Sequence, residues 1–470
     1  MRPAPRALRL VATRSFSSQS PTIDPAASLA GNLTLASLDA QITAVERRNR
    51  HLERAMAPAP VETNRFKLPE TYAATRKHLD FALSLTPAAY HDPDYYKAEL
   101  EQLWEKKWFA VEHVQAFTRH GDTQVVDVGK NSYIVTMDRH GELHAFHNVC
   151  RHRGSKLCTS GGNKKRINCP YHHWSYNLKG ELVGTPFFDQ PHFDRKLNSL
   201  FPVRVEVFAG LVWLCADMGA RPLREQLGAQ SEGLQQVDKF PFRDMAVVGA
   251  KDYHVNCDWK LLAENFLEYY HLNAVHPELA EYSTPEQHKG NQFPGNYVGY
   301  CTNPVTDSGS CVDLTEFHPN PGGEVLDTEE YRSFETAFFY QFFPNVSVSV
   351  FPNFVYSLIC LPGGPGKTIE KMTVLQHPGS KLASDSDEQY KAKVAEVMKF
   401  VSTVNQQDVD ICERVGLGVT QAAYPGGVFS PSMEGTVYRF QNLVIDAMTG
   451  AEPGPYPPVM VDYENTMTRR

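Results

Sequence analysis

Apolar and polar residues alternate along the chain with two different periods. Short alternating runs at 132–137, 142–149 and 176–184, separated by turns, predict strands of a small antiparallel β domain. An aromatic-rich run at 338–357 alternates in the same way and predicts further strands. Helical spacing instead governs residues 259–270, and it also predicts a helix at 404–418. The chain is therefore predicted to combine antiparallel sheet with helices.

The ends of the chain have a different character. The first twenty residues contain four arginines and no acidic residue, a composition typical of an organellar transit peptide. We give the arginines more weight than the serines in this segment, and this favours the mitochondrial matrix over the plastid stroma. A disordered basic tail is the alternative. Between Leu38 and Met56 apolar residues recur in steps of three and four, which predicts an amphipathic helix or a short coiled coil. Residues 449–460 are rich in Pro and Gly and predict an extended tail.

Composition narrows the classes of protein and partner. With 470 residues, 42% of them hydrophobic and 21% charged, the chain is globular and long enough for two domains. Its longest apolar run, 208–216, is about half of the roughly 18 residues that a membrane-spanning helix needs. A net charge of −8 argues against binding to nucleic acid or anionic lipid. Nine cysteines are too few for a disulfide framework and fit metal ligation better.

One group of candidate ligands lies within CRHRGSKLC and CPYHHW. Cys150 and His152 are separated by one residue, sixteen residues follow, and Cys169 and His172 are separated by two. Each short segment supplies one thiolate and one imidazole, so that two thiolates can bind one iron of a [2Fe–2S] cluster and two imidazoles the other. This arrangement is a Rieske centre. Zinc is the competing interpretation, but a zinc finger pairs its cysteines closely and then its histidines.

A second group lies further along the chain. His271 and His276 are five residues apart, slightly more than one helical turn, so both imidazoles can face one pocket. Two His and one carboxylate form the ferrous site that activates dioxygen, and Asp408 is the preferred carboxylate, with Asp410 as the alternative. Glu268, three residues before His271, is placed to hydrogen-bond a ligating imidazole.

The cluster spacing followed by ENFLEYYHLNAVHP at 264–277 resembles the catalytic α subunits of Rieske non-haem iron oxygenases. The resemblance covers about residues 85–445. It implies an α+β fold, with a small antiparallel β Rieske [2Fe–2S] domain before a larger helix-grip (START-like) catalytic domain that holds mononuclear Fe(II), and a head-to-tail homotrimer. The expected segments are a transit peptide, a helical extension, the Rieske domain, the catalytic domain and a tail, at 1–20, 21–84, 85–220, 221–448 and 449–470.

The resemblance also implies roles for single residues. A reductase outside the chain, NAD(P)H-dependent or acting through a ferredoxin, would reduce the cluster, because the sequence has no nucleotide-binding fingerprint. The electron would pass through Glu268, which would link His172 of one subunit to His271 of the next. Iron held by His271, His276 and Asp408 would then use O2 to hydroxylate a bound small molecule.

The substrate class follows from a narrower similarity. Glu268 within ENFLEYYH, together with CRHRGSKLC, is similar to the choline, carnitine and glycine betaine monooxygenases. The expected reaction is conversion of choline to betaine aldehyde hydrate, or oxidative N-demethylation of a betaine. His173 and the pair Val415-Gly416 depart from the family's usual residues. The alternatives are an aromatic-ring-hydroxylating oxygenase and a Rieske electron carrier without oxygenase activity.

Overall fold

The computed structural model describes residues 64–228, 234, 237–238, 240, 242–280, 288–292, 296–302, 337–350, 354–376 and 387–452. The chain divides into two compact units, Met1–Val61 and Glu62–Arg470. The first unit lies outside the described residues, and so do the predicted transit peptide, the predicted helix at 38–56 and residues 453–470 of the predicted tail. Those interpretations stay predictions.

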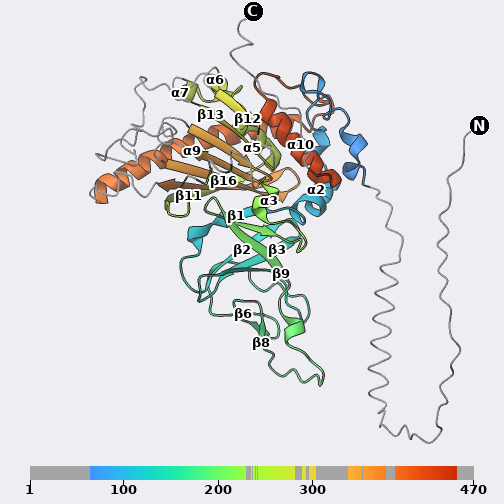
Figure 1. Ribbon diagram of the computed structural model, residues 1–470, viewed down its shortest axis with the longest axis vertical. Helices are drawn as coiled ribbons and strands as arrows, with labels where there is room; N and C mark the ends of the chain where they lie inside the picture. Colours follow the sequence, from blue (N-terminus) through green and yellow to red (C-terminus); the bar gives the residue numbers. More distant parts are fainter. Residues whose placement is uncertain are drawn as a thin grey trace, which may run out of the picture. The chain divides into compact units, whose positions relative to one another are not determined.

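The first lobe of the second unit, residues 107–220, is built on a seven-stranded sheet in the order β1-β10-β9-β4-β3-β2-β5. A three-stranded sheet, β6-β7-β8, lies beyond it (Figure 1). The longest apolar run of the sequence forms β10, which is buried throughout. The bounds are β1 Phe109–His113, β2 Asp122–Val128, β3 Asn131–Met137, β4 Leu143–His147, β5 Gly162–Asn163, β6 Ile167–Asn168, β7 Ser175–Tyr176, β8 Leu182–Gly184, β9 Pro202–Phe208 and β10 Leu211–Cys215.

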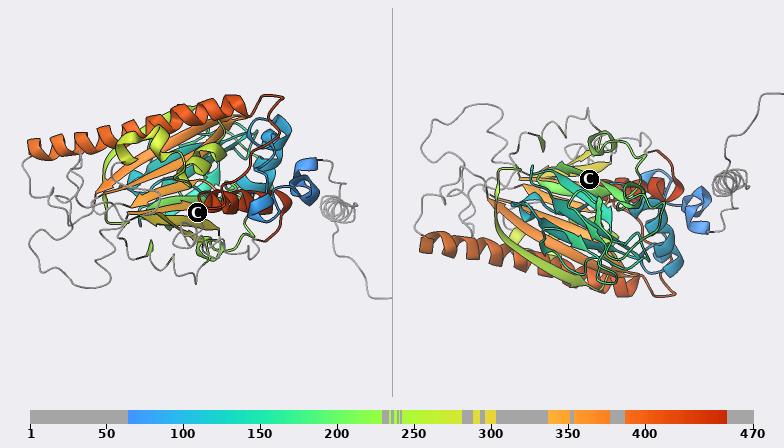
Figure 2. Two further views of the ribbon diagram at one scale, coloured as in Figure 1. Left: turned by 90° about the horizontal axis from the view of Figure 1, so that it is seen from above. Right: turned by 90° about the horizontal axis from the view of Figure 1, so that it is seen from below.

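The second lobe contains a seven-stranded antiparallel sheet in the order β11-β17-β16-β15-β14-β13-β12. Its strands are β11 Ala246–Val255, β12 His288–Gln292, β13 Tyr297–Thr302, β14 Ala337–Phe342, β15 Val346–Val350, β16 Phe354–Gly364 and β17 Lys367–Gln376. The long helix α9 (Asp387–Gly418) runs along this sheet (Figure 2). A side chain in place of Gly249 on β11 would collide with Met398 of α9, so the glycine permits this close packing.

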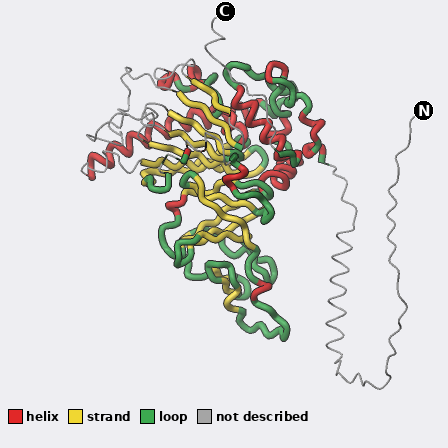
Figure 3. The backbone as a smooth tube through the Cα atoms, in the orientation of Figure 1, coloured by secondary structure: helices red, strands yellow, loops and turns green. Residues whose placement is uncertain are grey.

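Shorter helices complete the second lobe. They are α3 Leu223–Gln226, α5 Trp259–Phe266, α6 Leu272–Val275, α7 Pro277–Ala280 and α10 Gly435–Thr449. Helix α10 is buried along nearly its whole length and ends at Gly450, whose φ of 70° is the left-handed conformation of a helix C-cap. Figure 3 shows how the helices gather around the second lobe, whereas strands and loops dominate the first.

Residues 64–104 form short helical segments, and a buried ionic cluster joins them to α5. Lys260 Nζ lies 2.6 Å from Glu99 Oε1 and 2.7 Å from Asp258 Oδ1, and the Lys260 and Glu99 side chains are 0% exposed. Burial raises the pKa of Asp258 to about 7. The segments are η1 Arg65–Lys67, η2 Pro69–Tyr72, η3 Leu79–Phe81, η4 Pro87–Tyr90, α2 Pro93–Glu99, η5 Leu100–Trp104, and, further on, η6 Val114–Ala116 and η7 Lys196–Asn198.

The predicted α+β architecture of two antiparallel sheets with helices is confirmed. The predicted strands at 132–137, 142–149 and 176–184 correspond to β3, β4 and the pair β7 and β8. The run at 338–357 forms β14, β15 and the start of β16. The predicted boundary at residue 85 stays a prediction, although α2, which follows it, contacts the second lobe through Glu99.

The helix predicted at 259–270 is shorter than expected. It ends at Phe266, and α6 begins only at Leu272. Within the described residues, no helix combines the length and the hydropathy that crossing a membrane requires.

Candidate active site and cluster site

Two tight loops carry the candidate cluster ligands. Cys150 and His152 follow β4, on a loop whose flanks are joined by the bridge between Val149 and Lys156. Cys169 and His172 lie in the hairpin loop between β6 and β7, which pair in antiparallel register. In both loops the cysteine stands at the start and the histidine two or three residues later. The strands therefore hold each Cys and His pair in a fixed turn.

The four predicted ligands gather in two pairs. The Cys150 and Cys169 side chains are buried, and their thiols lie within hydrogen-bonding reach of each other. The imidazole rings of His152 and His172 have centroids 4.6 Å apart. The Nδ1 atoms of both rings are buried and have no hydrogen-bond partner within the described part of the chain. Buried polar atoms without a partner are rare and costly, so these two nitrogens fit metal ligation.

Neighbouring side chains support this loop pair. Trp174 stacks on His152 with ring centroids 4.7 Å apart and an interplanar angle of 10°. The Tyr176 hydroxyl lies 3.4 Å from Cys150 Sγ and accepts a hydrogen bond from the Arg151 backbone amide. A hydroxyl at a cluster sulfur stabilises added negative charge and so tunes the reduction potential of a bound cluster.

The backbone acts on the second thiol. Burial opposes ionisation of Cys169, but hydrogen bonds from the backbone amides of Tyr171 and His172 bring its pKa below the ordinary value for a thiol. A thiolate is the form that binds iron. The residue after His172 is His173, whose φ of 57° is a conformation that favours glycine.

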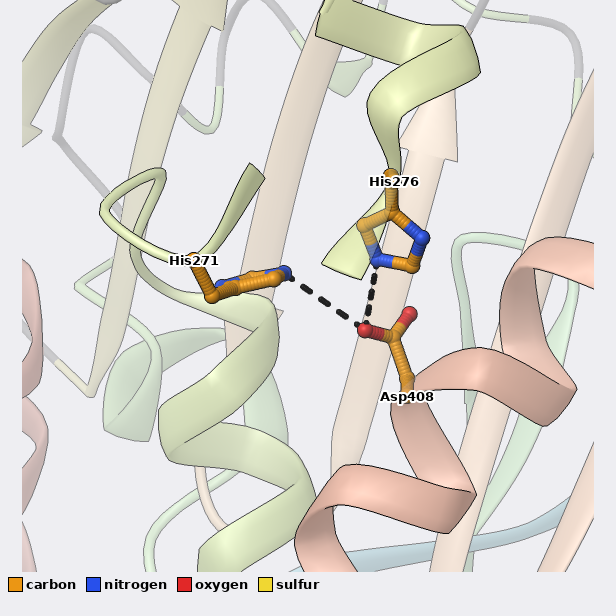
Figure 4. Close-up of side chains that lie close together, drawn as sticks. All are labelled: His271, His276 and Asp408. Atoms are coloured by element: carbon orange, nitrogen blue, oxygen red, sulfur yellow. Dashed lines mark hydrogen bonds and ion pairs between the residues drawn. The ribbon is translucent and has the colours of Figure 1, made fainter. Parts of the chain in front are cut away.

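Three residues of the second group converge on one point. The ligand atoms of His271, His276 and Asp408 all lie within 4.8 Å of one another. Nε2 of His276 is 2.8 Å from Asp408 Oδ1, and Nε2 of His271 is 3.5 Å from the same oxygen. Figure 4 shows both imidazoles directed at the same oxygen of that carboxylate. His271 and His276 flank α6, whereas Asp408 comes from the middle of α9.

Each imidazole is held by a second residue through its other nitrogen. Nδ1 of His271 lies 2.5 Å from Glu268 Oε1, and Nδ1 of His276 lies 2.7 Å from Gln407 Oε1. Because both acceptors are oxygens, the Nδ1 atoms carry protons. The Nε2 atoms, which hydrogen-bond Asp408 here, are therefore the ones that would give up their protons and ligate a metal. Two imidazole nitrogens and one carboxylate oxygen on one side are the donor set of a non-haem ferrous site. The residues therefore fit the iron that the sequence predicts.

Glu268 also explains why the helix predicted at 259–270 is interrupted. Its Oε2 accepts hydrogen bonds from the backbone amides of Tyr270 and His271, the latter at 3.1 Å. These amides would otherwise donate to carbonyls of α5 if the helix continued. The carboxylate instead holds the turn that precedes α6, and His271 is the N-cap residue of that helix.

The charges in this group are strongly coupled. Burial opposes a charge on His271, but hydrogen bonds to Asp408 and Glu268 outweigh burial and raise the pKa of His271 to about 9. Burial would raise the pKa of Asp408, yet hydrogen bonds from His271 and His276 keep it below its usual value. The site thus stabilises positive charge beside the carboxylates of Glu268 and Asp408. A bound divalent cation would provide that charge in place of protons.

The structure separates the two aspartates that the sequence left open. Asp408 faces the histidines, whereas Asp410 is exposed and accepts a hydrogen bond from Gln406. Gln407 was missed, since nothing in the sequence marks one glutamine of a polar helix as the partner of His276. The sequence also singled out no ring within the aromatic-rich run at 338–357. Phe339 of β14 packs edge-on against Phe266 and Tyr269, with centroids 6.1 and 6.0 Å away.

Comparisons with known proteins agree with this geometry. The family described as Rieske [2Fe-2S] domain matches residues 107–205, and the family described as Ring hydroxylating alpha subunit (catalytic domain) matches residues 242–450. The glycine betaine monooxygenase oxygenase subunit of Chromohalobacter salexigens is 35% identical over 201 residues, which cover 42% of this chain and 44% of that protein. The chloroplastic choline monooxygenase of Beta vulgaris is 25% identical over 367 residues, 76% of either chain.

Solved structures share the fold. The quaternary ammonium Rieske monooxygenase CntA, in complex with an inhibitor, superposes with a TM-score of 0.65 at 21% identity, over 81% of this chain and 99% of that one. The matches to the first curated relatives span about half the length of those proteins.

A β lobe with paired Cys and His loops is thus followed by a lobe whose residues fit one iron, so the chain offers sites for two metal centres. This chain belongs to the Rieske non-haem iron oxygenase α subunits. Its Rieske domain implies a [2Fe–2S] cluster, and its catalytic domain implies a mononuclear iron.

Proposed function

We propose that the protein is the oxygenase component of a monooxygenase acting on a small quaternary ammonium compound. It uses O2 and electrons from a separate NAD(P)H-dependent reductase or ferredoxin. Choline would yield betaine aldehyde hydrate, and a betaine would lose one N-methyl group as formaldehyde. The convergence of His271, His276 and Asp408, in a chain that also carries the cluster loops, is the observation that supports this proposal.

The residues of the chain have distinct tasks in this reaction. When bound, the cluster supplies single electrons and the mononuclear iron supplies activation of dioxygen. Glu268 and Gln407 fix the orientation and tautomer of the two histidines, so the ligand atoms are arranged before iron arrives. The Glu268 side chain is 14% exposed, which leaves room for a further donor, and we assign that place to His172 of a neighbouring subunit. This arrangement requires an oligomer, and a head-to-tail homotrimer satisfies it.

Three aromatic rings support the substrate class. Phe339 packs edge-on against both Phe266 and Tyr269, and each of the three residues is only partly buried. Tyr269 stands two residues before His271, which brings the rings close to the site. A trimethylammonium group has no N–H to donate, and aromatic faces bind it through cation–π attraction. Relatives named for glycine betaine and choline oxidation agree with such a substrate.

Oxygen uptake tests the reaction. Reconstituted protein with a surrogate reductase would be offered choline, glycine betaine, carnitine and benzoate, and the products identified by mass spectrometry. Uptake coupled to an oxidised choline or a demethylated betaine is expected. Uptake with benzoate alone would overturn the substrate class and leave the oxygenase assignment intact.

A binding measurement isolates the rings. Choline and its neutral isostere 3,3-dimethylbutan-1-ol differ mainly in charge, so their affinity ratio reports the cation–π contribution. Phe339→Leu should reduce the preference for choline by about 0.5–2 kcal/mol, whereas Phe339→Tyr, which retains an aromatic face, should preserve it. Equal ratios in both variants would remove Phe339 from the substrate site.

A second candidate is an aromatic-ring-hydroxylating oxygenase. The catalytic domain matches a family described as ring hydroxylating, and the same three rings can stack on an aromatic substrate. The benzoate arm of the uptake experiment distinguishes this candidate from the first.

The arginine-rich first twenty residues support import into the mitochondrial matrix, with the plastid stroma as the alternative. Fusing them to a fluorescent protein and imaging it against organelle markers tests this part of the proposal. A diffuse signal would contradict it.

A further inference from the structure

Three side chains form a row on one face of the second-lobe sheet. Phe339 of β14 pairs with Ser349 of β15, and Ser349 pairs with Tyr356 of β16. Residues directly opposite each other in antiparallel strands point to the same face of the sheet. Phe339, Ser349 and Tyr356 therefore lie side by side across three adjacent strands. We call these three residues the cross-strand row.

One end of the cross-strand row lies beside the candidate iron ligands. Phe339 packs edge-on against Tyr269 with ring centroids 6.0 Å apart, and Tyr269 precedes His271 by two residues. In Figure 4 strands of the second-lobe sheet pass behind the three candidate ligands. The face that carries the row is therefore the face turned toward the iron site.

The other end of the row lies beneath α9. Glu370 of β17 pairs with Cys360, which follows Tyr356 by four residues on β16, so Glu370 and Tyr356 share a face. Asn405 of α9 donates a hydrogen bond to Glu370 Oε2 at 2.7 Å, and Asp408 follows Asn405 by three residues on the same helix. Burial raises the pKa of the Tyr356 phenol well above its ordinary value, and the charges of Asp408 and Glu370 raise it further. Tyr356 is thus a neutral hydrogen-bond donor near Asp408.

Accessible space lies between the two ends of the row and the ligands. The His271 and Asp408 side chains are 17% and 23% exposed. Phe339 and Tyr356 are also partly exposed, whereas Ser349 between them is 0% exposed. A small molecule beside the ligands can therefore contact the ring of Phe339 and the hydroxyl of Tyr356, but not Ser349.

Ser349 supports the Tyr356 hydroxyl. The Ser349 Oγ is buried and has no hydrogen-bond partner of regular geometry within the described residues. It nevertheless lies close enough to the Tyr356 hydroxyl to oppose the rise of the Tyr356 pKa, as a hydroxyl does when it donates to a phenol oxygen. Donation from Ser349 to the Tyr356 oxygen directs the phenolic hydrogen to an acceptor elsewhere.

We propose that Tyr356 is a specificity-determining residue, which donates a hydrogen bond to the hydroxyl of a quaternary amino alcohol whose cation lies against Phe339. The inference rests on the proposed function and narrows its substrate class to amino alcohols such as choline. Neighbouring strands lie about 4.8 Å apart, so Phe339 and Tyr356 are separated by about 10 Å across the row. This span fits a cation on the ring, a two-carbon link and one hydrogen bond.

The groups around Tyr356 favour a hydroxyl over a carboxylate. Iron would offset the charge of Asp408, but Glu370 is 1% exposed and is hydrogen-bonded by the neutral groups of Asn405 and Cys360. Burial already raises the pKa of Glu370 to about 7. A substrate carboxylate beside it would place a second acidic group in the same buried region, which is costly. A hydroxyl accepts the hydrogen bond of Tyr356 without adding charge.

Binding to the full chain with both metal centres tests the role of Tyr356. Anaerobic calorimetry compares choline with propyltrimethylammonium, in which a methyl group replaces the hydroxyl, and with glycine betaine. We expect Tyr356→Phe to lower the affinity ratio of choline to propyltrimethylammonium about 3- to 10-fold, because one hydrogen bond to the substrate is lost. The affinity for propyltrimethylammonium should stay at the wild-type value. The wild type should bind choline more tightly than glycine betaine.

Two further variants control for indirect effects. Tyr340 follows Phe339 on β14 and points to the opposite face of the sheet, so Tyr340→Phe should retain the wild-type ratio. Ser349→Ala should lower the ratio in the wild type but not further in Tyr356→Phe, because Ser349 acts through Tyr356. An unchanged ratio in Tyr356→Phe, an equal loss in Tyr340→Phe, or tighter wild-type binding of glycine betaine than of choline would overturn the proposal.

Oxygen uptake separates this proposal from the proposed function. If choline supports uptake and Tyr356→Phe keeps the wild-type affinity ratio, the role of Tyr356 alone is rejected. The quaternary ammonium function itself is rejected if protein with both metal centres binds neither choline, propyltrimethylammonium nor glycine betaine, and takes up oxygen with benzoate.

Discussion

The cluster loops and the mononuclear site differ in how their histidines are satisfied. Nδ1 of His152 and of His172 is buried without a partner in the described residues. Nδ1 of His271 and of His276, by contrast, is hydrogen-bonded by Glu268 and Gln407, and both Nε2 atoms face Asp408. One site is incomplete without its metal, and the other is a closed network of its own side chains.

This difference indicates that the two lobes depend on their metals for stability to different extents. An unsatisfied buried polar group costs about 1–3 kcal/mol, so the cluster loops depend on the group they bind. The second lobe is instead stabilised from within, by a large core and by the buried contacts of Lys260 with Glu99 and Asp258. We therefore expect the cluster to be a structural part of the first lobe, and the mononuclear iron to bind a site that is already formed.

The largest effect is expected from Cys169→Ser. Loss of a thiolate ligand should abolish the cluster, and with it all cluster absorbance, and expose the first lobe to limited proteolysis. Iron content should fall from three per chain to the one of the catalytic domain. A variant without cluster that resists protease as the wild type does would contradict the structural role.

Asp408→Asn tests the opposite case. It should remove the mononuclear iron and lower turnover by more than about 100-fold. Loss of a residue that only hydrogen-bonds a metal ligand has a smaller effect. The cluster spectrum and the melting temperature should stay close to those of the wild type. Asp410→Asn is the matched control on the same helix, and it should retain both metal centres. Iron analysis and thermal unfolding check both variants, and cluster loss in Asp408→Asn would remove the contrast between the sites.

The buried ionic cluster provides a prediction on stability. Lys260→Met leaves Glu99 and Asp258 as uncompensated buried carboxylates, so the free energy of unfolding should fall by about 3–5 kcal/mol. Adding Glu99→Gln to Lys260→Met should restore part of the loss, because one buried charge is then removed. Denaturant unfolding of both variants measures the difference. An unchanged unfolding midpoint for Lys260→Met would show that the ion pairs of Lys260 do not stabilise the second lobe.

A smaller effect is expected from Glu268→Gln. Both metal centres should remain, and turnover should fall about 10- to 100-fold because the charged partner of His271 is lost. Gln407→Leu removes the corresponding partner of His276 and serves as the comparison. If Glu268 also links subunits, its variant should slow single-turnover oxidation of the cluster, and Gln407→Leu should not. Full activity in Glu268→Gln would eliminate the bridging role.

The sequence by itself determined the features that depend on nearby residues. The spacing from Cys150 to His172 specifies a Rieske centre because each Cys and His pair sits in one short turn. The strands around those turns were predicted for the same reason, since alternation reports local backbone geometry. The pair His271 and His276 was visible because both flank a single helical turn.

Only the tertiary structure determined the contacts between residues that lie far apart in the sequence. Asp408 lies 132 positions after His276, and the sequence could not separate it from Asp410 until the packing of α9 placed one inward and the other in solvent. Gln407, Phe339 and the interruption of the helix after Phe266 also depend on contacts across the fold. Spacing along a chain fixes which residues share a turn, whereas the packing of helix against sheet fixes which turns meet.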